Sequence, residues 1–387
     1  MIEVDAPTLI YTISALAVLS TLILLMMSSF FPEKIQGLTH WGLGTLSLAA
    51  TFALIRHRGE IPDWLSIVVA NGLVILGLLL FISALLSFYR RGPLKRRVYL
   101  VVGIPLTAII TWFTYGVESF QVRLIVMAAT QVVLFGILCA IPLRFGKFRS
   151  GEWVFSAAFA FAATVSAARL VSPVEGRDVP QHLLDGGPLQ VVYLASFSLT
   201  LLVGTIGFIL LANENLREKL EYLATYDSLS QVLNRRAFFD RAQVMLAQAQ
   251  RAGDPVAVLL IDIDYFKRIN DRLGHHVGDQ VIAGLCQITR GQLRTQDLLG
   301  RYGGEEFSVM LKISQDASAH EVAQRIRCAI EAGSAGLTES DYPHYTVSIG
   351  LAPANSTDTV ESLMIRADQA LYRAKQAGRN RVDVAPG

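Results

Sequence analysis

Seven apolar stretches occupy the first 212 residues of this 387-residue chain. They lie near residues 8–31, 39–56, 63–89, 98–116, 121–143, 152–172 and 188–212. A helix needs about 20 apolar residues to cross a lipid bilayer, because the hydrocarbon core is about 30 Å thick and offers backbone groups no partner. The sequence therefore predicts an α-helical transmembrane bundle over residues 1–212.

The charged residues separate this apolar part from a second, soluble part. Hydrophobic residues make up 52% of the chain, more than an ordinary soluble protein carries. Residues 1–212 hold 14 Lys and Arg and 10 Asp and Glu, whereas residues 213–387 hold 20 and 22. This pattern indicates a membrane sensor or anchor joined to a soluble module. Because the soluble part is slightly acidic, we expect no nucleic acid as a partner.

Basic loops predict the orientation of the spans. The segments 90–97 and 144–149 are rich in Lys and Arg, and such loops stay in the cytoplasm. The N-terminus and the segment 173–185 are acidic and are expected outside. Seven retained spans then deliver the C-terminal part to the cytoplasm. One basic loop, Arg56–Arg58, falls outside in this arrangement.

Residues 213–225 are predicted to form a helical linker. Its leucines at positions 216, 220 and 223 lie on one helix face, which is typical of a dimerising seam. A segment this short is not a stable coiled coil by itself. A solvated helix that continues out of the membrane has the same pattern, and the spacing favours the seam only slightly.

Residues 226–387 are predicted to form an α/β domain, because helical and strand periodicities alternate along them. We expect helices at 235–251, 276–292, 317–332 and 359–377, and strands at 256–262, 296–301, 306–312, 344–351 and 380–384.

Two segments of this domain carry the residues expected to do chemistry. In the run 301–307, two glycines in a hairpin turn are followed at once by Glu305 and Glu306, which are hard oxygen ligands for a metal. Upstream, a buried strand ends in Asp262 and Asp264, whose period-two spacing puts them on one face. A lysine, an Asn-Asp pair and a Gly-Asp pair follow. The combination indicates a nucleoside triphosphate site with Mg²⁺.

Five segments together resemble the GGDEF-domain diguanylate cyclases, in their GGEEF variant. The segments are 226–236, 262–279, 301–307, 346–350 and 367–380. The resemblance covers about residues 222–384 and implies a mixed sheet flanked by helices, similar to the palm of polymerases and nucleotidyl cyclases. It also implies a transferase of bacterial signalling, anchored in the inner membrane, that condenses two GTP into cyclic di-GMP and two pyrophosphates. The two GTP sites would face each other in a homodimer.

The resemblance assigns roles to individual residues. Asp262, Glu305 and the backbone carbonyl of Ile263 would hold Mg²⁺, with Mn²⁺ as an alternative, and Glu306 would lie beside them. Whether Glu305 also acts as general base stays open. The catalytic set would be Glu305, Asp262 and Lys267. The residues expected at GTP are Asn270 and Asp279 at the guanine, Lys267, Lys375 and Arg379 at the triphosphate, the backbone of Tyr265 and Phe266, and Gly304.

An Arg-x-x-Asp pair stands upstream of the signature. Arg294 and Asp297 match the family's inhibitory site for the product, and Arg325 matches the arginine that another subunit would contribute. Arg and Asp three residues apart are common on any surface, so this assignment rests on the offset from Gly303. In the opening motif the sequence departs from the family, since Ser230-Gln231 stands where Thr-Gly is usual. The early turn or the dimer contacts are expected to differ there.

Several residues are interpreted as structural. His275 and His276 are expected to support the loop rather than to transfer protons. Cys139, Cys286 and Cys328 have no metal-ligand spacing and are expected to be buried small apolar residues. Ionisable residues are few in the spans, which argues against a transporter.

Two other functions compete with an active cyclase. One is a catalytically idle domain that binds GTP or cyclic di-GMP and signals by protein contact. The other is a membrane receptor whose main output is another protein. The intact Asp262, Glu305 and Lys267 favour the active cyclase, because idle members of the family lose such residues.

Overall fold

The computed structural model describes residues 6–30, 36–147, 149–171, 188–313, 318–335 and 344–386. The chain divides into two compact units, Met1–Leu216 and Arg217–Gly387. Each unit is described by itself.

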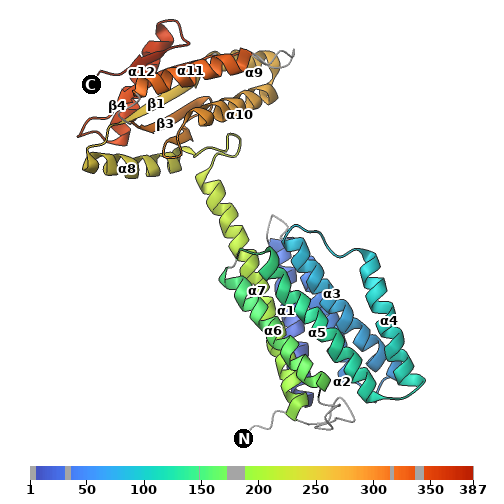
Figure 1. Ribbon diagram of the computed structural model, residues 1–387. Coiled ribbons are helices and arrows are strands. Elements are labelled where there is room, and N and C mark those ends of the chain that lie inside the picture. Colours follow the sequence, from blue (N-terminus) through green and yellow to red (C-terminus); the bar gives the residue numbers. More distant parts are fainter. Residues whose placement is uncertain are drawn as a thin grey trace. The chain divides into compact units, whose positions relative to one another are not determined.

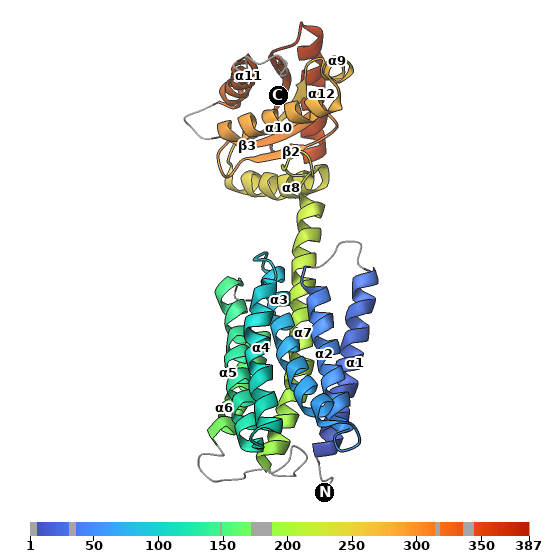
Figure 2. The same cartoon turned by 90° about the vertical axis from the view of Figure 1, so that its right-hand side faces the viewer.

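The first unit is a bundle of helices (Figure 2). Its helices are α1 (Ala6–Phe30), α2 (Leu38–Arg56), α3 (Ala70–Phe88), which follows a π-helical turn at Trp64–Val69, α4 (Arg96–Tyr115), α5 (Phe120–Phe145), α6 (Ser150–Val171) and α7 (Pro188–Thr225). Among the described residues, seven helices are long and apolar enough to cross a membrane. The predicted number of spans is therefore confirmed as a number of candidate helices, each of which starts within two residues of its expected start.

An aromatic cluster holds the centre of the bundle. The Trp41 ring of α2 stacks on Phe81 of α3 and on Phe208 of α7, at centroid distances of 4.3 and 4.6 Å. The edge of the Trp41 ring also meets Phe155 of α6 at 5.5 Å. The indole N–H donates to the Thr205 hydroxyl at 3.3 Å, so the one polar atom of the ring is satisfied.

The basic loop that disagreed with the orientation rule is held by local partners. Arg56 donates to the hydroxyl of Tyr11 at 2.5 Å, and His57 lies 2.8 Å from Glu60. Arg58 donates to a backbone carbonyl at 2.8 Å. The loop is thus built into the bundle.

The linker residues 213–225 form the C-terminal end of helix α7. Helix α7 runs without a break from Pro188 to Thr225, because its apolar span passes directly into a run of good helix formers. Leu220 and Leu223 lie on it with 57% and 51% of their surface exposed. Whether they form a dimerising seam stays a prediction.

The second unit is a five-stranded sheet flanked by helices (Figure 1). Its elements are α8 (Arg235–Ala252), β1 (Val256–Ile263), α9 (Phe266–Leu273), α10 (His275–Gln292), β2 (Leu298–Arg301), β3 (Glu306–Lys312), α11 (Ala319–Ala335), β4 (Val347–Pro353), α12 (Val360–Gln376) and β5 (Val382–Val384). The strand order is β2-β3-β1-β4-β5, with β1 antiparallel to both neighbours and β4 parallel to β5. Every predicted element is present, but the short helix α9 was not predicted.

Successive side chains of the central strand, β1, point to opposite faces of the sheet and enter two separate hydrophobic cores. Ala257, Leu259 and Ile261 face the apolar sides of α10 and α11, whereas Val258 and Leu260 face α8 and α12. Both cores draw residues from the second unit alone. We therefore expect residues 217–387 to fold without the first unit.

Two glycines set how closely helices approach the sheet. A Cβ at Gly350 of β4 would lie 2.0 Å from the carbonyl oxygen of Ala367, so α12 presses directly on that strand. A Cβ at Gly300 of β2 would lie 2.7 Å from the side chain of Phe238 in α8. The close approach at Gly350 matters for the site, because α12 carries Lys375.

Candidate active site

Asp262 lies at the end of β1, on the face that α12 covers. It stands opposite Glu306 of β3 and Ser348 of β4 in the strand register. The Asp262 carboxylate is only 6% exposed, and its Oδ2 lies 2.8 Å from Nζ of Lys375, which is 31% exposed. A residue predicted for the metal and a residue predicted for the triphosphate are thus brought together.

The signature turn joins β2 to β3 and is held by Arg301. The Arg301 guanidinium donates to the carbonyl of Gly303 at 3.2 Å and to that of Gly304 at 2.6 Å. A Cβ at Gly303 would lie 2.5 Å from Oε2 of Glu306, so glycine leaves room for that carboxylate. A Cβ at Gly304 would meet nothing within 4 Å. The open space at Gly304 permits a ligand to approach the backbone.

The carboxyl groups at this strand end repel one another. Burial raises the pKa of Asp262. The hydrogen bond and the positive charge of Lys375 lower it, but by less. Burial, and then the negative charge of Asp262, raise the pKa of Glu305 and also that of Glu306. Three acids with one lysine leave the site with excess negative charge.

A divalent cation fits this excess. Asp262, Glu305 and the Ile263 carbonyl are the expected ligands, and the backbone N–H of Ile263 donates to the Glu305 carbonyl at 3.4 Å, which ties the two segments together. Among the described residues, no three His, Cys, Asp or Glu side chains are arranged to hold a metal by themselves. Two carboxylates are enough for Mg²⁺ when phosphate oxygens and waters complete its shell.

The acid cluster should destabilise the folded domain at neutral pH. An acid whose pKa is higher in the folded than in the unfolded state favours folding at a pH below its unfolded-state pKa. The folded domain loses this stability as the pH rises through the folded-state pKa, because the acid then becomes charged in an unfavourable place. We therefore expect Glu306→Gln to raise the melting temperature of residues 217–387 by about 1–3 °C at pH 7.5, which corresponds to at most about 1 kcal/mol for a half-buried side chain. Near pH 4 the difference should vanish.

The control for this thermal measurement is Glu361→Gln. Hydrogen bonds at the start of α12 lower the pKa of Glu361, so its replacement should have the opposite sign at pH 7.5. A Glu306→Gln domain that melts at or below the wild-type temperature at pH 7.5 would contradict the repulsion.

The start of α9 presents the expected phosphate-binding residues. Tyr265 precedes the helix in a left-handed conformation (φ 58°), and Phe266 and Lys267 form its first turn. Helix N-termini leave N–H groups free for anions. The Arg379 guanidinium lies 4.5 Å from the centre of the exposed Tyr265 ring. Lys267 is exposed, so the structure leaves it accessible to a ligand.

Asn270 has a buried oxygen without a partner. Within the described part of the chain, its Oδ1 accepts no hydrogen bond. A Cβ at Gly278 of α10 would lie 1.9 Å from this oxygen, so the glycine makes room for the amide. An orphaned buried acceptor is costly unless a ligand supplies the donor. Asp279, the other expected guanine reader, follows Gly278 on α10 and is exposed.

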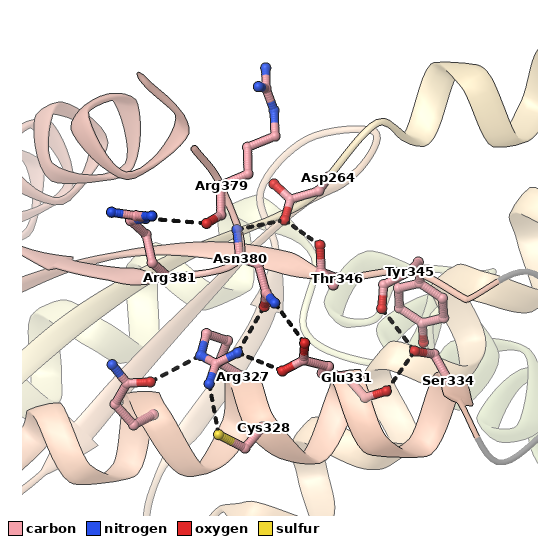
Figure 3. A network of polar contacts seen from close by, with 11 residues as sticks. Asp264, Arg327, Cys328, Glu331, Ser334, Tyr345, Thr346, Arg379, Asn380 and Arg381 are labelled. Atoms are coloured by element: carbon pink, nitrogen blue, oxygen red, sulfur yellow. Dashed lines mark hydrogen bonds and ion pairs between the residues drawn. The ribbon is translucent and has the colours of Figure 1, made fainter. Parts of the chain in front are cut away.

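Asp264, which the sequence analysis grouped with Asp262 as a carboxylate of the nucleotide site, has structural partners there. It is buried, and its carboxylate accepts from the hydroxyls of Thr346 and Ser348, both at 2.7 Å. The backbone N–H of Asn380 donates to it at 3.1 Å (Figure 3). Asp264 therefore joins the ends of β1 and β4 to the turn after α12. The hydroxyl residues Thr346, directly before β4, and Ser348, on β4, were the signal for this contact.

The opening motif forms a turn at the position where its sequence departs from the family. Asp227 accepts from the Ser230 hydroxyl at 2.7 Å and from Arg301 at 2.9 Å. Burial raises the pKa of Asp227, but these hydrogen bonds outweigh it and hold the pKa below its usual value. Gln231 adopts φ 55°, a left-handed conformation that glycine takes freely. Its side chain bonds to Tyr222 and to the carbonyl of Ser228.

Glycine at position 231 should relieve this backbone strain. We expect Gln231→Gly to have a free energy of unfolding about 1 kcal/mol higher than Gln231→Ala, because both lose the side-chain bonds and only alanine keeps the strain. Urea unfolding of residues 217–387 would measure the difference. An alanine variant as stable as the glycine variant would contradict this account.

The residues expected at an inhibitory site lie near one another. The Asp297 carboxylate accepts from the backbone N–H of Arg294 at 2.8 Å and from that of Lys312 at 3.2 Å, so it also shapes the turn before β2. Arg325 of the same chain reaches the carbonyl of Gln292 at 2.9 Å.

One structural interpretation was wrong. Cys286 is buried as expected, but Cys328 is exposed and Cys139 is half-buried. Cys328 lies on the outer side of α11, where the Arg327 guanidinium donates to its sulfur at 2.9 Å. His275 and His276 are exposed at the start of α10.

Comparison with known families identifies the second unit. The family model described as "Diguanylate cyclase, GGDEF domain" matches residues 224–381. This part of the chain belongs to the GGDEF-domain family. The acid cluster, the signature turn and Asn270 all lie within the GGDEF domain.

Curated relatives and a solved structure share this GGDEF domain. Diguanylate cyclase DgcM of Escherichia coli is 38% identical over 169 residues, which are 44% of this chain and 40% of DgcM. Response regulator PleD of Caulobacter vibrioides is 41% identical over 170 residues, 43% of this chain and 37% of PleD. The chain thus spans about two fifths of the length of these relatives. The coiled coil and GGDEF domain of DgcB from Caulobacter crescentus, solved in complex with c-di-GMP, is 34% identical, with a TM-score of 0.41 over 45% of this chain and 93% of that one.

Proposed function

We propose that this protein is a membrane-bound diguanylate cyclase that condenses two GTP into cyclic di-GMP and two pyrophosphates. The observation that carries the proposal is the acid cluster at the end of β1, where Asp262, Glu305 and Glu306 outnumber their lysine. Such a cluster is unfavourable for folding and is suited to a cation that binds phosphates. A relative named diguanylate cyclase and a domain solved with c-di-GMP support the choice of reaction.

Different residues of the site bind the metal, the triphosphate and the guanine base. Asp262, Glu305 and the Ile263 carbonyl would hold Mg²⁺, or Mn²⁺ in its place, which supplies charge for the α-phosphate and acidity for the attacking hydroxyl. Lys267, Lys375 and Arg379 hold the triphosphate, and Lys375 moves from Asp262 toward the phosphates as they arrive. Asn270 and Asp279 read the guanine.

The reaction requires two copies of the site. The 3′-oxygen of each GTP forms a bond to the α-phosphorus of the other, and the bond from that phosphorus to pyrophosphate breaks. One GGDEF domain holds one GTP, so two domains must meet face to face as a homodimer. The exposed leucines of α7 are a candidate seam for this pairing.

Membrane anchoring and product inhibition complete the proposal. The seven apolar helices support an anchor in the bacterial inner membrane, and the basic loops between them support a GGDEF domain on the cytoplasmic side. Arg294, Asp297 and Arg325 would bind cyclic di-GMP and slow the enzyme. Arg294 and Asp297 would contact the product from one subunit, and Arg325 would contact it from another.

The test uses the full-length protein in detergent with GTP and MgCl₂, and cyclic di-GMP is quantified by chromatography. The wild type should form product, and Glu305→Gln, which keeps the shape but not the charge, should form none. Asp240→Asn, an exposed acid on α8, is the control and should match the wild type. Bound GTP without product from a dimeric wild type would instead favour an idle receptor.

A further inference from the structure

The turn after α12 carries unusual backbone conformations. Gly378, Arg379 and Asn380 have φ values of 114°, 65° and 44°, so two residues with side chains follow glycine in the left-handed region. Residues with side chains adopt this conformation at a cost, so it persists only where surrounding contacts enforce it. The structure therefore has to supply those contacts.

An ion pair on α11 supplies them through the Asn380 amide. Arg327 Nη1 lies 2.7 Å from Oε2 of Glu331, one helical turn away. The same Nη1 donates to Oδ1 of Asn380 at 2.8 Å, and Nδ2 of Asn380 donates to Oε1 of Glu331 at 2.7 Å. Figure 3 shows the amide facing both charged side chains. The amide oxygen of Asn380 thus faces the positive guanidinium, and its NH₂ group faces the negative carboxylate.

The backbone of the same asparagine reaches the active site. The N–H of Asn380 donates to Asp264, the buried acid that joins the ends of β1 and β4. Asp264 lies two residues beyond Asp262 on β1, and its charge acts on that carboxylate. On the other side, Asn380 directly follows Arg379, whose guanidinium lies over Tyr265 at the start of α9.

We propose that Asn380, clamped by Arg327 and Glu331, is a positioning residue for the GTP triphosphate. The clamp fixes the left-handed turn that directs Arg379 toward the phosphate-binding start of α9, and through Asp264 it fixes the strand end that carries Asp262. The inference rests on the proposed function for the identity of the ligand. It adds three residues that contact no reacting atom and act through Arg379 and Asp264.

The variant Asn380→Gly removes the contacts of the asparagine amide but is expected to keep the fold of the turn. Glycine adopts the left-handed conformation without strain, so the chain can still turn, but both amide contacts are lost. In full-length protein in detergent we expect the KM for GTP to rise about tenfold or more, with kcat within about threefold of the wild type. Glu331→Gln keeps an acceptor for the Asn380 Nδ2, so its KM for GTP should lie between those of the wild type and of Asn380→Gly.

The control is Arg366→Gln, which breaks the ion pair between Arg366 and Asp358 at the start of α12. That pair is as close, at 2.6 Å, and its carboxylate is more buried than that of Glu331. This variant should lose stability but keep the KM. An unchanged KM in Asn380→Gly, or an equal rise in Arg366→Gln, would overturn the proposal.

A binding measurement keeps this proposal separate from the proposed function. The probe is GTP with a methylene group between the α- and β-phosphorus atoms, which cannot release pyrophosphate. Asn380→Gly should bind it about tenfold more weakly than the wild type. If the wild type bound the probe but made no product from GTP, only the cyclase assignment would fail. Equal binding by both proteins would reject the clamp alone.

Discussion

Asparagine in place of Asp262 is expected to lower the rate of cyclic di-GMP formation by about a thousandfold or more, which is roughly 4 kcal/mol of transition-state stabilisation. The Asp262 carboxylate is the most buried acid of the cluster and holds Lys375 at 2.8 Å. Asparagine has the same shape but is a poor ligand for a hard cation, and it leaves Lys375 without its counter-charge. Initial rates with saturating GTP and MgCl₂ measure the effect.

The loss should be catalytic rather than structural. The substitution removes a negative charge that raises the pKa of Glu305 and Glu306, so the melting temperature should not fall by more than a few degrees. Asp254→Asn is the matched control, because Asp254 pairs with Lys312 at 2.6 Å beside the other end of β1. That variant should keep the wild-type rate. An Asp262→Asn enzyme within tenfold of the wild type would rule out the proposed role.

The helices and strands could be predicted from the sequence wherever one hydrophobic pattern continued over a long segment. The apolar runs locate the candidate membrane helices, and the alternation in β1 places Asp262 on the face that α12 covers. The helix α9 escaped prediction because it is only eight residues long and polar, with Phe266 as its one buried side chain. Helix α7 continues past residue 213 because a change in hydrophobicity does not end a helix unless a cap or a breaker stands there, and such a continuation was one of the two interpretations that the sequence left open.

Long-range contacts limited what could be predicted about the site. The sequence brings Asp262 and Lys375 into one hypothesis but does not show that they touch, since 113 positions separate them. It also groups Asp264 with Asp262 as a carboxylate of the nucleotide site but does not show its partners, which include Ser348 of β4 and the backbone N–H of Asn380 after α12. At Gln231, where the sequence departs from the family pattern, the structure has a left-handed conformation that the residue type does not predict.

Leucine in place of Asn270 is expected to weaken GTP binding about a hundredfold without lowering the stability of the domain. The Oδ1 atom is buried against Gly278 and has no donor in the described part of the chain, so the folded protein carries its desolvation cost. Leucine has a similar shape and removes that cost. The two effects of one substitution therefore have opposite signs, which is typical of a residue kept for a ligand.

The choice between guanine and adenine gives the sharper form of this prediction. The N1–H and N2–H₂ donors of guanine can satisfy an unpaired carbonyl oxygen, whereas adenine has no donor at those positions. Asn270→Leu should therefore lose GTP affinity but keep its weak affinity for ATP, as titration of residues 217–387 would show, whereas Asp271→Leu on the exposed face of α9 should keep the wild-type preference. A site that merely confined a purine would lose both nucleotides together, and equal losses would mean that Oδ1 of Asn270 does not read the base.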